Sequence, residues 1–112
     1  ERRWGEYKAV DTEEFPDGYK SLTKQLKIKS GKCISYQVHR HCDKVWTFID
    51  GEGELVLDGI RSIVGRGDTV TIKKGIKHAV RAISDLTFIE VQSGALLVES
   101  DVERFEWIWS DR

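Results

Sequence analysis

Gln37-Val38-His39-Arg40-His41 is the stretch of this sequence that decides its fold, and it holds two of the chain's three histidines. Trp46 and Gly51-Glu52-Gly53 follow it. In a β-strand, side chains two residues apart point to the same face. His39 and His41 are therefore expected to project side by side, with Gln37 before them. The third histidine, His78, lies far along the chain, and a fold that brings it beside the pair would gather three imidazoles.

Short segments that alternate polar and apolar residues fill most of the remaining chain, with glycine-containing turns between them. Such alternation predicts half-buried strands. They are expected over residues 19–29, 33–41, 45–49, 54–57, 60–64, 69–72, 78–83 and 86–92, with a short strand near residues 4–7. Asp58-Gly59 between two of these segments is a strong hairpin signal. Strands at a spacing of roughly ten residues with glycine turns predict an all-β sandwich or barrel.

Two segments need a surface to pack against. Within residues 33–41, Ile34, Tyr36 and Val38 share an apolar face by alternation, which a second sheet or a second subunit must cover. Near the end of the chain, Ser100-Asp101-Val102-Glu103 has the form of a capping box. This motif predicts a short C-terminal helix over residues 101–107. The apolar residues 107–109 are expected to pack on the barrel or on a partner.

The composition is typical of one globular domain spanning residues 1–112. The chain has 112 residues, of which 39% are hydrophobic and 33% charged, enough for one domain and too few for two. A net charge of −1 gives no electrostatic case for binding nucleic acid or an anionic membrane. No apolar run approaches the ~20 residues of a spanning helix or resembles a signal peptide, so a cytoplasmic location is expected. Cys33 and Cys42 lack metal or redox spacing and are expected to be free thiols.

Three converging histidines would form a ligand set for a divalent metal. Imidazole suits zinc, manganese, iron, nickel and cobalt, and a three-histidine set leaves coordination positions open for water or substrate. The alternative is that the three histidines are hydrogen-bonded pocket residues with no metal. Their spacing leaves both interpretations open.

The order of these motifs resembles that of the cupins, with H-x-H, a glycine turn and then G-x-x-H on short strands. More narrowly, the chain resembles the type II mannose-6-phosphate isomerase domain, which also occurs fused behind mannose-1-phosphate guanylyltransferases. The resemblance runs nearly the full chain. The matching segments are Arg3-Trp4-Gly5-x-Tyr7, Gly18-Tyr19-Lys20, Gln37-x-His39-x-His41, Trp46, Gly51, Leu57-Asp58-Gly59, Gly75-x-x-His78, Glu90-Val91-Gln92-Ser93-Gly94 and Ser100-Asp101-Val102.

This resemblance implies an all-β fold, the cupin double-stranded β-helix or jelly-roll barrel, in a homodimeric assembly. It also implies a divalent metal in the barrel, bound by His39, His41 and His78. The implied chemistry interconverts mannose 6-phosphate and fructose 6-phosphate through an enediol, with the metal polarising the carbonyl and a base moving the proton. A small sugar phosphate or nucleotide sugar is the expected ligand.

Position 44 departs from the family pattern, in which a glutamate that binds the metal stands where this chain has Lys44. An ammonium group is a poor neighbour for a divalent cation. The histidines could hold a metal alone, or the site could be metal-free with Lys44 binding the sugar or acting as a base. The pocket could also bind without catalysis, or Lys44 could lie at an exposed strand edge. Further departures from the family pattern are Cys42, Lys73, Ala79 and Ala82.

Other polar residues complete the candidate site. Lys44 and Gln92 are the candidate catalytic residues, and Gln92 points into the barrel if the register through Leu86 and Phe88 is even. The candidates for substrate binding are Gln37, Trp46, Lys73 and Glu90, with Lys73 in either a cationic rim or a solvated turn. The leading interpretation is a sugar-phosphate isomerase. The alternatives are a metal-free nucleotide-sugar ketoisomerase or epimerase, and a carbohydrate-binding or sensing cupin without turnover.

Overall fold

The computed structural model describes residues 3–98 and 100–109, which form ten strands and no helix. The strands are β1 (Gly5–Glu14), β2 (Lys20–Ile28), β3 (Cys33–Val38), β4 (Asp43–Asp50), β5 (Glu52–Leu57), β6 (Ile60–Gly65), β7 (Thr69–Ile72), β8 (His78–Ala82), β9 (Leu86–Gly94) and β10 (Glu103–Phe105). The described residues accordingly contain no helix that is long and apolar enough to cross a membrane.

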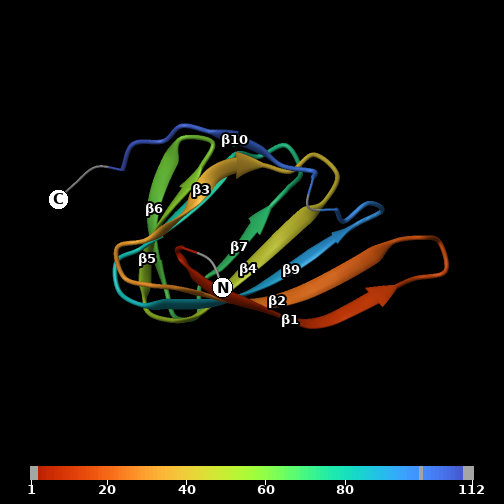
Figure 1. Cartoon of the computed structure of the whole chain (residues 1–112), viewed down its shortest axis with the longest axis horizontal. Coiled ribbons are helices and arrows are strands. Elements are labelled where there is room, and N and C mark those ends of the chain that lie inside the picture. Colours follow the sequence, from red (N-terminus) through yellow and green to blue (C-terminus); the bar gives the residue numbers. More distant parts are fainter. Residues whose placement is uncertain (1–2, 99, 110–112) are drawn as a thin grey trace.

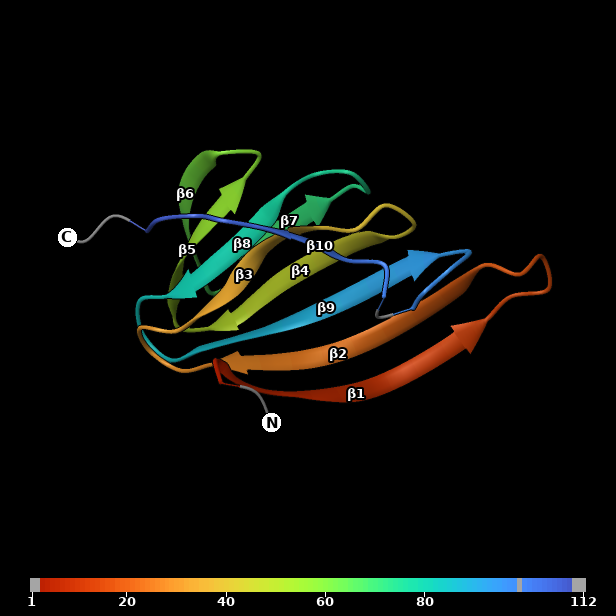
Figure 2. The same cartoon turned by 45° about the horizontal axis from the view of Figure 1, so that its top comes forward.

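The strands form two antiparallel sheets that face each other (Figure 1). One sheet has the order β1-β2-β9-β4-β7 and the other β10-β3-β8-β5-β6. Neighbours such as β2 and β9 are far apart in the sequence, so each sheet interleaves strands from both ends of the chain. Figure 2 shows β1 and β2 at one edge of the first sheet and β6 at the opposite edge of the second. This is the predicted double-stranded β-helix arrangement.

The main hydrophobic core lies between the sheets, because every second side chain of a strand points inward. Its largest fully buried side chains include Trp46, Phe48 and Phe88, whose rings contact one another at centroid distances of 5.0–6.3 Å. The register pairs Phe48 with Phe88, then Trp46 with Glu90, then Lys44 with Gln92. Along these two strands the apolar core therefore gives way to a polar region.

Most strand predictions are confirmed to within a few residues, although β1 is longer than expected, and the hairpin at Asp58-Gly59 is confirmed too. Its two turn residues have φ angles of 45° and 82°, the left-handed pair that a tight hairpin requires.

The prediction that one strand covers residues 33–41 was wrong. Strand β3 ends at Val38, and its register against β8 shifts between Ile34 and Gln37. His39 and His41 lie beyond the strand, so alternation does not place them on one face.

The predicted C-terminal helix is also wrong. Residues 100–109, called here the C-terminal strap, contain β10, which pairs antiparallel with β3. Phe105, Trp107 and Trp109 recur at the two-residue period of a strand rather than at a helical period. The Asp101 carboxylate accepts hydrogen bonds from the loop after β3 instead of lying in the first turn of a helix.

The aromatic residues of the strap cover the outer face of the second sheet. Phe105, Trp107 and Trp109 pack against a second buried cluster made of Tyr36, Val56 and Ala79, and Tyr36 and Trp107 have a centroid distance of 5.1 Å. The chain itself therefore covers Tyr36 of the predicted apolar face. Ile34, which alternation placed on the same face, packs instead in the main core between the sheets, because the register against β8 shifts between Ile34 and Gln37. The homodimer stays a prediction.

Gly51 occupies a position that admits no side chain. Its φ is 90°, and a Cβ there would overlap the backbone carbonyl of Asp85. Gly67 has a φ of 92° with open space around it, so it is a matched control for the backbone strain alone. We expect Gly51→Ala to lower the free energy of unfolding by about 1–3 kcal/mol more than Gly67→Ala, because overpacking adds to the strain. Urea unfolding of both variants measures the difference, and equal losses would contradict the close approach.

Candidate functional site

A cavity of about 1050 Å³ opens between the sheets where the core turns polar. Of the residues predicted from the sequence, those that line it are Gln37, His39, Lys44, Trp46, Glu90 and Gln92. Both free cysteines, Cys33 and Cys42, also line it, and burial raises the pKa of the Cys42 thiol. The structure thus gathers most of the candidate residues in one place.

A buried carboxylate organises the inner wall of the cavity. Glu90 Oε2 lies 3.1 Å from Lys44 Nζ and accepts a hydrogen bond of 2.9 Å from Trp46 Nε1. Gln92 Nε2 donates to Glu90 Oε1 over 2.8 Å. The Lys44 and Glu90 side chains are only 8% and 4% exposed. Both carboxylate oxygens therefore have partners, and a buried charge with partners of this kind is rigidly held.

The environment of Glu90 keeps it ionised. Burial on its own would raise its pKa, but the Lys44 charge and the hydrogen bonds from Trp46, Gln92 and Lys44 outweigh burial and lower the pKa to about 2. A carboxylate with so low a pKa is a weak proton acceptor. Glu90 is therefore suited to holding Lys44 and Gln92 in place rather than to moving a proton.

His39 and His78 lie against each other beside this network. Their rings are stacked with centroids 5.4 Å apart, and His78 also meets Trp46 edge-on at 5.6 Å. His78 Nδ1 is 2.9 Å from the Ile76 carbonyl oxygen. His39 Nδ1 and His78 Nε2 are buried with no hydrogen-bond partner among the described residues.

Both imidazoles are neutral near pH 7. Burial, and then the Lys44 charge, lowers the pKa of His39 and of His78 to about 4. A neutral imidazole has one nitrogen that can accept a proton. His39 lines the cavity, so it is the histidine that a ligand could reach.

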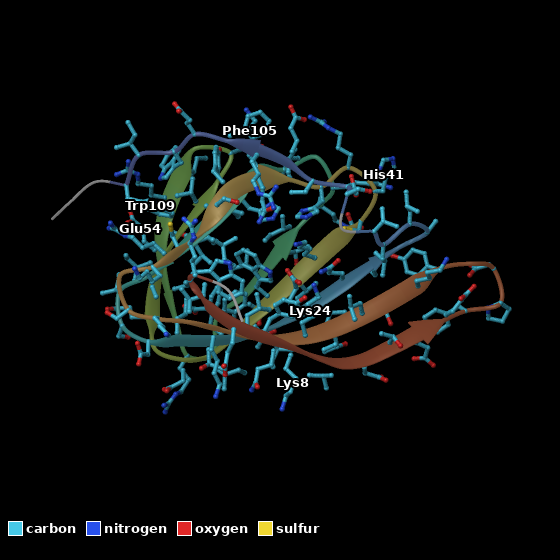
Figure 3. All side chains as sticks on the ribbon, in the orientation of Figure 1. Lys8, Lys24, His41, Glu54, Phe105 and Trp109 are labelled. Atoms are coloured by element: carbon cyan, nitrogen blue, oxygen red, sulfur yellow. The ribbon has the colours of Figure 1, made fainter. Side chains whose placement is uncertain are left out.

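His41 and Lys73 are not brought to this site. The His41 side chain is 58% exposed, and its Nδ1 lies 3.1 Å from Asp101 Oδ1 on the strap. Figure 3 shows it at the outer end of the barrel. Lys73 is exposed in the turn after β7 and is not among the described residues that line the cavity. The predicted three-histidine set therefore reduces to the pair His39 and His78.

The lining also includes cationic residues that sequence reasoning missed, namely Arg3, Lys24, Lys32 and Arg104. Lys24 had a usable signal, because it shares the inward parity of Leu22 and Leu26 on β2. Figure 3 shows Lys24 on the inner side of its strand, whereas Lys8 of β1 points away from the barrel. The signal for Arg104 was indirect, since its position depends on the strap forming a strand, which the alternation of Phe105, Trp107 and Trp109 favours. Within the described lining Glu90 is the single acidic residue, so the cavity has an excess of positive charge.

With this geometry in place, comparison with known proteins identifies the chain's relatives. The family described as mannose-6-phosphate isomerase C-terminal matches residues 1–107. The chain belongs to this family. It is 31% identical over 106 residues to a mannose-1-phosphate guanylyltransferase of Escherichia coli K12, and 34% identical over 110 residues to the alginate biosynthesis protein AlgA of Pseudomonas fluorescens. The alignments cover 93% and 96% of this chain but only 21% and 22% of those relatives.

Solved structures show that the fold is shared more widely than the family. A Klebsiella pneumoniae protein with a double-stranded β-helix domain has a TM-score of 0.72 at 20% identity, over 96% of this chain and 89% of that one. KdgF from Halomonas sp. has a TM-score of 0.61 at 17% identity, over 76% and 86%. At these identities the likeness shows the fold alone.

The residues present do not fit the divalent metal that the family resemblance implies. Lys44 stands where the family resemblance implies a metal-binding glutamate, and its ammonium group is already paired with Glu90. His41 is turned to the strap. Within residues 3–98 and 100–109, no group of three or more histidine, cysteine or acidic side chains is arranged to hold a metal. A fixed ammonium beside the two remaining histidines would also repel a dication at low dielectric.

Proposed function

We propose that the barrel cavity binds a phosphorylated hexose and interconverts its aldose and ketose forms without a divalent metal. The observation that carries this proposal is the buried Lys44–Glu90 pair, which puts an ammonium group in the wall of a cavity that the neutral imidazole of His39 also lines. His39 Nδ1 has no hydrogen-bond partner among the described residues. One group can stabilise negative charge and the other can accept a proton. These are the two functions that aldose–ketose isomerisation requires.

The reaction would run through His39 and Lys44. In the open-chain aldose, the His39 imidazole takes the proton from C2, and that C–H electron pair forms the C1–C2 double bond. The negative charge then lies on the C1 oxygen, where the Lys44 ammonium stabilises it. The C2 hydroxyl proton moves to the C1 oxygen, and His39 returns its proton to C1 to give the ketose. Glu90 and Gln92 keep Lys44 in position.

The charge of the cavity supports a phosphorylated ligand. The described residues that line the cavity include four cationic residues besides Lys44 and no acidic residue other than Glu90. Glu90 is neutralised by Lys44, so the other cations are not offset within the lining. A phosphate group would balance this charge, and lysine and arginine are its usual partners.

A second candidate is binding without turnover. It is favoured by the state of Glu90, whose two oxygens are both engaged and whose pKa is about 2. His39 is then the base on which catalysis depends. If His39 does not reach C2 of the sugar, the same cavity would hold a sugar phosphate as a sensor or carrier.

Turnover by metal-stripped protein tests the proposal. With a chelator present, we expect conversion of mannose 6-phosphate to fructose 6-phosphate, with solvent deuterium entering at the exchanged carbon. Since general base catalysis contributes roughly 10²–10⁴-fold, His39→Asn should lower the rate by about that factor. His41→Asn is the matched control and should keep the rate, because His41 faces the strap.

Three results would count against the proposal. Turnover that needs added manganese, zinc or cobalt would contradict the metal-free mechanism. Equal losses in the His39 and His41 variants would contradict the role of His39. Saturable binding of mannose 6-phosphate without turnover would favour the binding function instead, and the same assay with nucleotide sugars would reveal a different substrate.

A further inference from the structure

The C-terminal strap borders the cavity as well as the outer face. Val102 and Arg104 line the cavity, together with Leu97 and Val98 from the segment before the strap. In β10, Arg104 is paired with Gln37 of β3, and Gln37 also lines the cavity. Phe105, the next residue, packs on the outer cluster instead. Strand alternation thus directs Arg104 to the cavity side of the strap.

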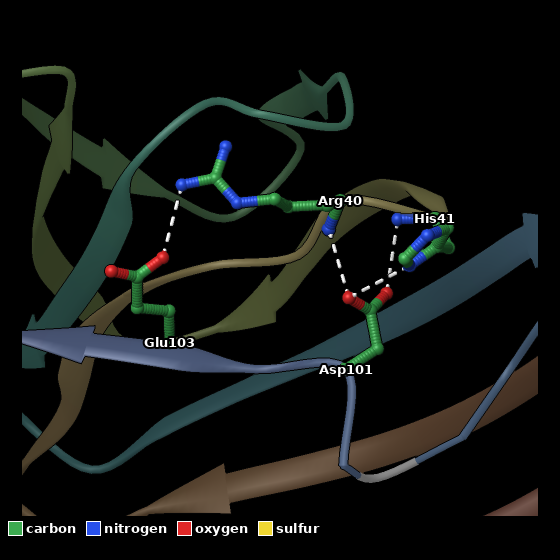
Figure 4. Close-up of polar contacts among 4 residues, drawn as sticks. All are labelled: Arg40, His41, Asp101 and Glu103. Carbon is green, nitrogen blue, oxygen red and sulfur yellow. Dashed lines mark hydrogen bonds and ion pairs between the residues drawn. The ribbon is translucent and has the colours of Figure 1, made fainter.

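The strap is fastened at both ends of β10. On one side, Asp101 accepts hydrogen bonds from the backbone nitrogens of Arg40 and His41 at 3.1 and 3.0 Å, and His41 Nδ1 lies 3.1 Å away (Figure 4). These hydrogen bonds lower the pKa of the Asp101 carboxyl although its burial would raise it. On the other side, Trp107 and Trp109 pack on the outer cluster. The backbone that carries Arg104 is therefore held in place.

None of the strap's three acidic residues, Asp101, Glu103 and Glu106, forms an ion pair with Arg104. Asp101 is engaged by the loop, and Glu103 Oε1 binds Arg40 Nη2 at 3.0 Å, as Figure 4 shows. No hydrogen bond or ion pair joins the Arg104 side chain to any residue within 3–98 or 100–109. Of the other cations that line the cavity, Lys44 is paired with Glu90, and Lys24 Nζ lies 4.8 Å from the Tyr7 ring centre. Arg3 and Lys32 precede β1 and β3, whereas Arg104 is paired with Gln37 near the end of β3 that leads to His39. Among the described residues, Arg104 thus presents a free guanidinium at the edge of a cationic cavity.

We propose that Arg104 binds the phosphoryl group of the ligand, so that the strap determines the preference for phosphorylated over neutral sugars. This inference rests on the proposed sugar-phosphate ligand and adds the residue that recognises it. A guanidinium presents a planar pair of N–H donors that matches two phosphate oxygens. The fastening by Asp101 and the tryptophans reduces the ordering that binding would otherwise require.

Affinities of the full chain for four probes test the inference: mannose 6-phosphate, fructose 6-phosphate, inorganic phosphate and mannose. For Arg104→Gln we expect a loss of roughly tenfold to hundredfold for the three phosphorylated or phosphate probes, with unchanged affinity for mannose. Arg104→Lys should retain part of the affinity. The matched control is Arg40→Gln, which removes a cation that binds the strap but does not line the cavity and should change affinity by less than about twofold.

The outcomes separate this inference from the proposed function. If Arg104→Gln binds mannose 6-phosphate like the wild type, or loses mannose to the same extent, the role of Arg104 is overturned while sugar binding stands. If the wild type prefers phosphorylated sugars through Arg104 but never turns them over, Arg104 stands and the isomerase proposal fails. If the wild type prefers no phosphorylated probe over mannose, the Arg104 inference and the proposed ligand class both fail.

Discussion

Lys44→Met is expected to lower the free energy of unfolding by about 3–5 kcal/mol, the cost of leaving one partner of a buried ion pair alone. The variant removes the ammonium group that lies 3.1 Å from Glu90 Oε2 and leaves a carboxylate that is 4% exposed. Glu90 then either stays charged without its cation or takes up a proton. Chemical denaturation at neutral pH measures the loss of stability. The unfolding free energy should depend on denaturant concentration with the same slope in the variant and the wild type.

Two further variants make this prediction specific. Lys44→Met combined with Glu90→Gln should recover much of the loss, because the buried charge is gone and the oxygen of the new amide can still accept from Trp46 Nε1. Arg66→Met is the control for ion pairs in general. Arg66 Nη2 lies only 2.7 Å from Asp50 Oδ1, but both side chains are mostly exposed, so little stability should be lost. Equal effects of the Lys44 and Arg66 variants would contradict a buried, functional pair.

Acid is expected to destabilise the domain between about pH 6.5 and pH 4. His78 has a pKa of about 4 in the fold against 6.5 for the ordinary side chain, so the unfolded chain binds more protons in this range. A group whose pKa is lowered by folding contributes its full stabilisation at pH values above its pKa in the unfolded chain. This stabilisation is lost as the pH falls to its pKa in the folded protein. For His78 this amounts to about 3 kcal/mol, and His39, which is more exposed, adds in the same direction.

Histidine variants show which side chain causes this loss of stability in acid. His78→Asn should flatten the fall in stability across that range, even if it lowers stability at pH 7 by removing ring contacts. His41→Asn should keep the fall, since His41 lies outside the cavity. Glu90 adds a later loss, because its stabilisation is present above its unfolded pKa of 4.5 and disappears towards pH 2. A profile as steep in His78→Asn as in the wild type would contradict the buried neutral imidazole of His78, because only the contribution of His39 should remain.

Strand alternation predicted the part of the inner wall formed by Glu90 and Gln92, whereas the family resemblance placed Lys44 there. Lys44 and Trp46 on β4, and Glu90 and Gln92 on β9, lie at inward positions of regular strands, where a period of two is reliable. The same reasoning failed at His39 and His41, because β3 ends at Val38 after a register shift. The sequence around H-x-H carries no signal for that shift.

The end of the chain was mispredicted because a local motif competed with a tertiary contact. Ser100 and Glu103 have the spacing of a capping box, but Asp101 and Glu103 find partners in the loop after β3. The period-two spacing of Phe105, Trp107 and Trp109 was visible in the sequence and favoured a strand. Weighing it would have placed Arg104 on the opposite side from these aromatic residues.

Metal titration of protein purified without a histidine tag tests the central claim most directly, namely that a cavity with Lys44 in place of a metal-binding glutamate works without a divalent metal. With zinc, manganese and cobalt as separate titrants, calorimetry should detect no saturable binding to the wild-type chain. Lys44→Glu should acquire saturable binding, because it adds a second carboxylate beside Glu90, His39 and His78. One equivalent of metal bound by the wild type and lost in His39→Ala would contradict the claim.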